Sequence, residues 1–72
     1  MNKRQITLSN GNKIEIREPV VRDMRIVATF ENEVEKELNL IGNLTGLTGN
    51  EIDELSLKDY GLLQEELKSF LS

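Results

Sequence analysis

Two short stretches that alternate apolar and polar residues, with a turn between them, constrain the fold of this chain most. Gln5–Ser9 and Lys13–Arg17 each repeat with a period of two, which is typical of half-buried strands. The intervening Asn10-Gly11-Asn12 has the composition of a tight turn. A two-stranded hairpin is only marginally stable in water. The sequence therefore predicts a hairpin over about residues 4–18, with its apolar face against helices or another chain.

The length of the loop follows from the pairing of apolar side chains. A two-residue loop would set apolar residues opposite charged ones, whereas a three-residue loop places four apolar side chains on one face. The expected pairs are Leu8 with Ile14 and Ile6 with Ile16. We therefore expect a three-residue loop with Gly11 or Asn12 in the left-handed conformation.

Beyond the hairpin the apolar period becomes helical. Pro19 ends the second strand because it fixes φ and lacks a ladder donor. Asn32, Thr48 and Ser56 are helix-capping signals, and Gly46 suits the C-terminal end of a helix. The predicted helices span about residues 20–30, 33–45, 49–55 and 57–71. The expected fold is α+β: one small domain over residues 1–72, with an N-terminal β-hairpin followed by about four short α-helices.

The first predicted helix is apolar on two sides. Val20, Met24, Val27 and Ala28 form one stripe, and Ile26 and Phe30 form a separate pair four residues apart. We expect the hairpin to cover one side and later helices the other. The alternative is that one side binds a partner.

The composition of the chain argues against an enzyme. Its 72 residues contain no cysteine and no histidine, which removes disulfides, thiolate zinc sites, cysteine nucleophiles and the usual proton-transfer group. Neighbouring acids such as Glu65 and Glu66 diverge by about 100° on a helix, so they do not converge on a substrate. We expect no catalytic residues, no cofactor and no metal.

The charges are distributed unevenly along the chain. Residues 1–28 carry six basic and three acidic groups, and residues 29–72 carry three basic and ten acidic groups. An acidic second half repels phosphates, so no nucleic acid is expected as a partner. The rival interpretation is a DNA-binding helix-turn-helix over 33–45, Gly46 and 49–55, which would turn Glu51, Asp53 and Glu54 toward phosphates. The polar start and the lack of a long apolar run predict neither a signal peptide nor a membrane segment.

Protein–protein interaction is the function class that remains. The candidate partner-binding residues lie off the main apolar stripes: Ile26, Phe30, Leu40 and Leu62. Such side chains could bind another protein or support self-association. Packing of all four within the domain is the alternative.

An ordered set of short motifs resembles one protein family. The motifs are Ile6–Gly11 (ITLSNG), Ile16–Pro19 (IREP) with Arg22-Asp23, Leu40–Leu47 (LIGNLTGL), Glu51–Leu55 (EIDEL), Ser56–Tyr60 (SLKDY), Leu63-Gln64 and Phe70-Leu71. Taken in this order, they resemble the small tail assembly chaperones of tailed phages and Mu-like prophages. The resemblance covers most of residues 5–71.

The resemblance implies a non-enzymatic function in the host cytoplasm. Such chaperones bind the phage tape measure protein, keep it soluble, help recruit major tail-tube subunits and are absent from the mature virion. The motif positions that carry over are conformational: Pro19, Gly46 and Tyr60. A small phage DNA-binding regulator and a structural virion subunit remain as alternative functions.

Overall fold

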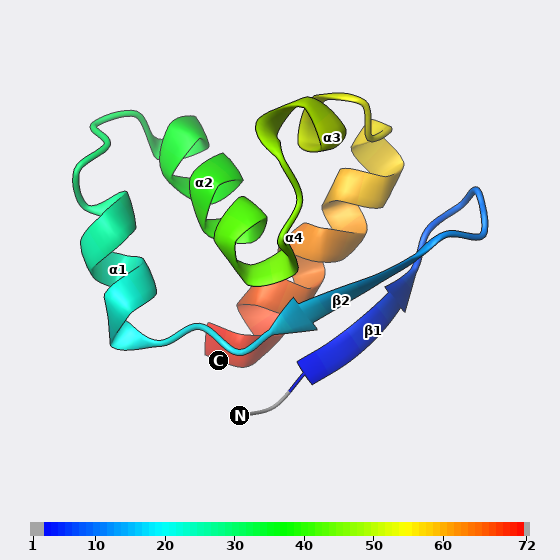
Figure 1. Cartoon of the computed structure of the whole chain (residues 1–72), viewed down its shortest axis with the longest axis horizontal. Coiled ribbons are helices and arrows are strands. Elements are labelled where there is room, and N and C mark those ends of the chain that lie inside the picture. Colours follow the sequence, from blue (N-terminus) through cyan, green and yellow to red (C-terminus); the bar gives the residue numbers. More distant parts are fainter. Residues whose placement is uncertain (1–2, 72) are drawn as a thin grey trace.

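The structure is a computed structural model that describes residues 3–71. An antiparallel hairpin of β1 (Lys3–Thr7) and β2 (Lys13–Arg17) is followed by α1 (Val21–Val27), α2 (Glu33–Thr45), α3 (Gly49–Asp53) and α4 (Leu57–Leu71), as Figure 1 shows. The prediction of an α+β fold with one hairpin and four helices is confirmed. The expected range 1–72 also includes residues 1, 2 and 72, which lie outside the described residues.

The helix bounds differ from the predicted ones mainly at α1. It ends at Val27 rather than near residue 30, and α3 ends at Asp53 rather than near residue 55. The Asn32 side chain accepts hydrogen bonds from the amides of Val34 and Glu35, which fixes the start of α2. α2 and α4 extend over the predicted ranges 33–45 and 57–71.

The hairpin has a different register from the expected one. Ile6 lies opposite Ile14, and Ile16 lies opposite Arg4. The expected pairing is therefore wrong by two residues. A shift of two keeps every side chain on its own face, so alternation alone does not distinguish the two registers.

The turn and a contact with α4 account for the observed register. The loop has the expected three residues, but they are Ser9–Gly11: the Leu8 amide donates to the Asn12 carbonyl (2.8 Å), and Gly11 has a φ of +88°. The amide and hydroxyl of Ser9 also donate to the Asp59 carboxylate, at 2.9 and 3.0 Å. The loop is thus hydrogen-bonded to the first turn of α4. This contact is long-range, so the periodicity of the strands cannot predict it.

The core lies between the hairpin, α2 and α4. Its buried apolar residues are Ile6, Leu8, Ile16, Ile41, Leu44, Leu63 and Leu67. α1 contributes no buried apolar residue, because its one buried side chain is Asp23. The main neighbour of α1 is α2, and Figure 1 shows α1 at one end of the molecule. α1 is therefore largely peripheral to the core.

Candidate partner-binding surface

An ion pair joins the end of β2 to the start of α1. Arg17 donates through Nη1 and Nη2 to the two carboxylate oxygens of Asp23, at 2.8 and 2.7 Å. The Val20 amide donates to the same carboxylate (2.8 Å), and Asp23 is only 2% exposed. The Arg17 guanidinium holds the pKa of Asp23 below its ordinary value. Together these bonds fix the connector containing Pro19 and the first turn of α1.

The inward position of Asp23 determines which side of α1 faces outward. Successive helical residues are rotated by about 100°, so turning Asp23 inward turns Val21 and Met24 away from the domain. Val21 is 65% exposed and Met24 is 63% exposed. The expectation that the hairpin and later helices cover both apolar sides of this helix is therefore wrong for Met24. The residue that α1 buries is the ion-paired aspartate, which apolar periodicity does not identify.

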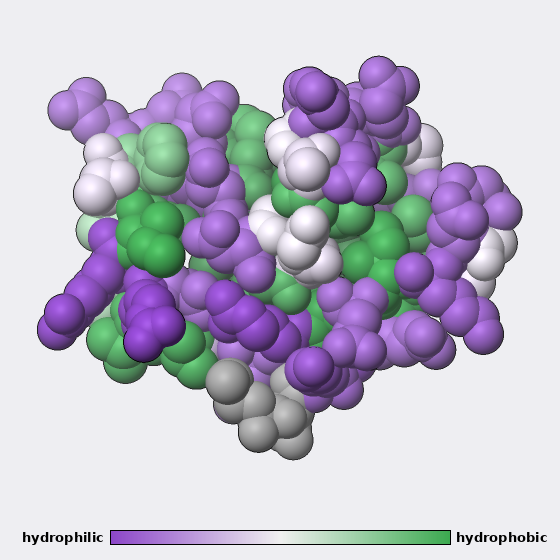
Figure 2. Space-filling model, in the orientation of Figure 1, coloured by the Kyte–Doolittle hydropathy of each residue, from purple (hydrophilic) through white to green (hydrophobic). Residues whose placement is uncertain are grey.

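Four apolar side chains at α1 are exposed and form the candidate surface. These are Val20, Val21, Met24 and Ile26, and we call them the α1 surface. At about 100° per residue, Val21 and Met24 lie on one side of α1, and Ile26 lies beyond the row formed by Arg22 and Arg25. Figure 2 shows hydrophobic residues at this end of the molecule beside strongly hydrophilic ones. Other large exposed apolar residues, Val34, Leu57 and Leu71, lie on α2 and α4. Three of its members, Val21, Met24 and Ile26, lie on α1 itself, and no other described element carries as many large exposed apolar residues.

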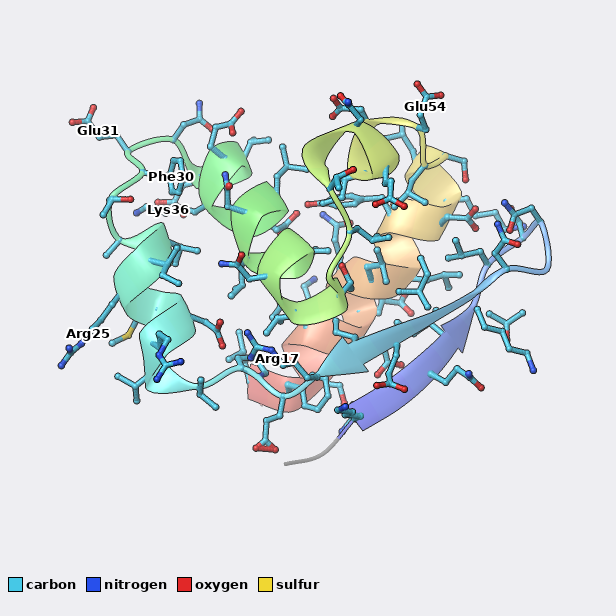
Figure 3. The ribbon with its side chains drawn as sticks, in the orientation of Figure 1. Arg17, Arg25, Phe30, Glu31, Lys36 and Glu54 are labelled. Atoms are coloured by element: carbon cyan, nitrogen blue, oxygen red, sulfur yellow. The ribbon has the colours of Figure 1, made fainter. Side chains whose placement is uncertain are left out.

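Two arginines accompany the α1 surface. Arg22 and Arg25 are exposed, and neither forms a salt bridge with another residue of the part of the chain that the structure describes. In Figure 3 the Arg25 side chain projects outward from α1, away from α2. The exposed face of α1 is thus both apolar and basic, although the whole chain has a net charge of -4.

The structure places the four sequence-predicted partner residues in two different settings. Ile26 belongs to the α1 surface, and Phe30 is half-buried between the end of α1 and the start of α2, as Figure 3 shows. Leu40 and Leu62 are partly buried and pack against the core. The structure therefore brings Ile26 and Phe30 to one end of the molecule and sets Leu40 and Leu62 against the core. The apolar pattern did not identify Val21 or Met24 as partner-binding residues. Their exposure follows from the Arg17–Asp23 pair, which turns the opposite side of α1 inward.

The conformational motif residues stabilise the ends and contacts of helices. Gly46 ends α2 with a φ of +78°, the left-handed conformation expected for a residue at that position. Tyr60 donates to Glu37 (2.9 Å), which joins α4 to α2. Burial raises the pKa of Tyr60 above its ordinary value, and the neighbouring Glu37 carboxylate raises it further. Both motif positions therefore have structural roles.

The rest of the described chain offers a groove and no sign of a metal site or a membrane-spanning helix. A groove of about 600 Å³ lies between α2 and α3, where Leu38, Gly42 and Ile52 are accompanied by Glu35, Asn39 and Asp53. No group of acidic residues within 3–71 is arranged to hold a metal ion. Among the described helices, none is both long enough and apolar enough to cross a bilayer.

Comparison with models of known protein families identifies the family of this chain. The family model described as "Phage tail assembly chaperone proteins, E, or 41 or 14" matches residues 7–72. The chain belongs to this family. The match covers the loop–α4 contact, the Arg17–Asp23 pair and the whole α1 surface of this tail assembly chaperone. Neither the curated proteins nor the solved structures include a significant match.

Proposed function

We propose that this tail assembly chaperone binds the tape measure protein of its phage through the α1 surface. In this proposal it acts without catalysis, keeps the tape measure protein soluble in the host cytoplasm and helps recruit major tail-tube subunits. The observation that carries the proposal is a group of exposed apolar side chains on a tail assembly chaperone whose net charge is -4.

The size of the α1 surface suits reversible binding. Covering the exposed fractions of Val20, Val21 and Met24 would contribute roughly 4 kcal/mol, because full burial of such a side chain contributes about 1.5–3 kcal/mol. The loss of translational and rotational freedom on association opposes this contribution and is of similar size or larger. A single chaperone would therefore bind weakly and could leave before the tail is complete. The net negative charge of the chain favours solubility of the complex.

The four sequence-predicted residues enter the proposal in different ways. We propose that Ile26 contacts the partner directly and that Phe30 supports that contact from the α1–α2 connection. Leu40 and Leu62 pack against the core, so a charged substitution at either residue could alter folding as well as binding. Their part in binding is therefore tested only with variants whose unfolding midpoint remains that of the wild type.

Co-expression tests the proposal. The chain is expressed with the tape measure protein of its phage, and the soluble fraction and co-elution of that larger protein are measured. We expect the large protein to be soluble and to co-elute only with the chaperone. Met24→Glu should abolish this effect, whereas Leu57→Glu, at a residue that is 90% exposed on α4, should not. Equal solubility with and without the chaperone would contradict the proposal.

Two assays separate this proposal from the other functions. A DNA-binding regulator would shift duplex DNA in a salt-dependent manner, and a structural subunit would be present in purified virions. The chaperone proposal predicts no such shift and no chain in the mature particle. Size-exclusion chromatography of the purified chain reports any self-association.

A further inference from the structure

The apolar and basic residues of α1 lie on adjacent rows of the helix. Val21, Met24 and Ala28 are spaced three and four residues apart, so they form one exposed stripe. Arg22 and Arg25 are three residues apart and form the next row around the helix. A helix that packs on the stripe would therefore have two guanidinium groups along one of its edges.

These two arginines differ from the other arginines of the chain in their contacts. Arg17 is paired with Asp23, and Arg4 donates to Glu66 (3.1 Å) and lies 4.2 Å from the centre of the Phe70 ring. Arg22 and Arg25 form no salt bridge within residues 3–71. Their charges are therefore accessible to a partner, and Arg binds carboxylates well because its planar fork can donate two hydrogen bonds.

From this arrangement we infer that the α1 surface binds an amphipathic helix whose apolar stripe is flanked by carboxylates. The inference rests on the proposed function, because it describes the tape measure segment that the chaperone would select. The partner's apolar residues cover Val21 and Met24, and its Asp or Glu side chains pair with Arg22 and Arg25. A second copy of α1 does not fit this requirement, because two α1 surfaces face to face would bring four unpaired arginines together.

Two synthetic helical peptides test the inference. They share one leucine stripe, and their flanking positions carry glutamate in one peptide and lysine in the other. We expect the full chain to bind the glutamate peptide at least tenfold more tightly than the lysine peptide at low salt, by calorimetric titration. The preference should decrease at high salt because the ion pairs lie at an exposed edge. Equal affinities, or tighter binding of the lysine peptide, would overturn the inference.

A charge-reversal variant provides the matched control. Arg22→Glu combined with Arg25→Glu leaves the apolar stripe intact and changes only exposed side chains, and circular dichroism verifies its fold. The variant should prefer the lysine peptide. If it keeps the preference of the wild type, the arginines do not select the partner and the inference fails. A third result would be that the wild type self-associates as its concentration rises while the variant does not. That result would identify a second copy of the chain as the occupant of the α1 surface and would also overturn the inference.

The tape measure protein separates the inference from the function on which it rests. If the wild type and the charge-reversal variant solubilise it equally well, the proposed function stands and the inference fails. If neither protein solubilises it while the wild type still prefers the glutamate peptide, the charge selectivity stands and the proposed function fails.

Discussion

The Arg17–Asp23 pair should be among the most important polar contacts for the stability of this domain. The change to make is Asp23→Asn, which retains the shape of the side chain and removes its charge. Because an amide has one acceptor oxygen where the carboxylate has two, the change removes at least one of the three hydrogen bonds donated by the guanidinium and the Val20 amide and weakens the rest. Because Asp23 is almost fully buried, the loss affects a carboxylate that water does not reach.

The expected destabilisation is about 2–3 kcal/mol. Hydrogen bonds to charged groups contribute about 1.5–3 kcal/mol, and breaking a fully buried ion pair costs about 3–5 kcal/mol. The value falls below the second range because the Arg17 side chain is 30% exposed and can be solvated after the substitution. For a domain of 72 residues the total free energy of unfolding is about 4–11 kcal/mol, so the loss is a large fraction of it.

Urea unfolding at pH 7, followed by circular dichroism, measures this loss. The matched control is Glu15→Gln, which removes the charge from the exposed pair with Lys3, whose side chains are 61% and 59% exposed. We expect the control to cost less than about 0.5 kcal/mol, since exposed pairs contribute little. If Asp23→Asn destabilises the domain no more than Glu15→Gln does, the pair does not fix α1 and the reasoning is wrong.

Three further predictions follow from helix ends and pKa values. Gly46→Ala should destabilise by about 1–2 kcal/mol because an alanine is strained at φ +78°, whereas Gly49→Ala in α3 should have little effect, as urea midpoints will show. Spectrophotometric titration should show Tyr60 ionising well above pH 10, together with unfolding, because its pKa is raised in the folded state; ionisation near pH 10 without unfolding would contradict this. The lowered pKa of Asp23 means that its stabilising contribution is complete above about pH 4 and is lost as the pH falls through the folded-state value. The urea midpoint of Asp23→Asn should therefore fall less steeply in acid than that of the wild type, and parallel profiles would refute the assignment.

Local patterns predicted most of the secondary structure. The alternation on either side of the turn identified the hairpin, and the capping residues Asn32, Thr48 and Ser56 identified the starts of three helices. Each of these signals depends on residues close together in the sequence. The hairpin register could not be predicted in this way, since it also depends on the contact between Ser9 and Asp59, fifty residues apart.

The candidate surface was predicted only in part, for the same reason. Ile26 was identified because it lies off the main stripe, but the stripe containing Met24 was expected to be covered by other elements of the domain. The side of α1 that faces inward is set by a charge pair between two elements, and apolar periodicity does not identify that side. An aspartate in the first turn of a helix, six residues after an arginine at the end of a strand, is the signal that would have indicated it.

A titration of the isotope-labelled chain with a soluble fragment of the tape measure protein, followed by amide chemical shifts, tests the central claim most directly. We predict that the largest shift changes fall on residues 20–28 and are lost in Met24→Glu. The start of α4, where Leu57 is 90% exposed, should change little. No binding, or shift changes confined to α3 and the start of α4, would contradict the assignment of the α1 surface as the site where this chaperone holds its partner.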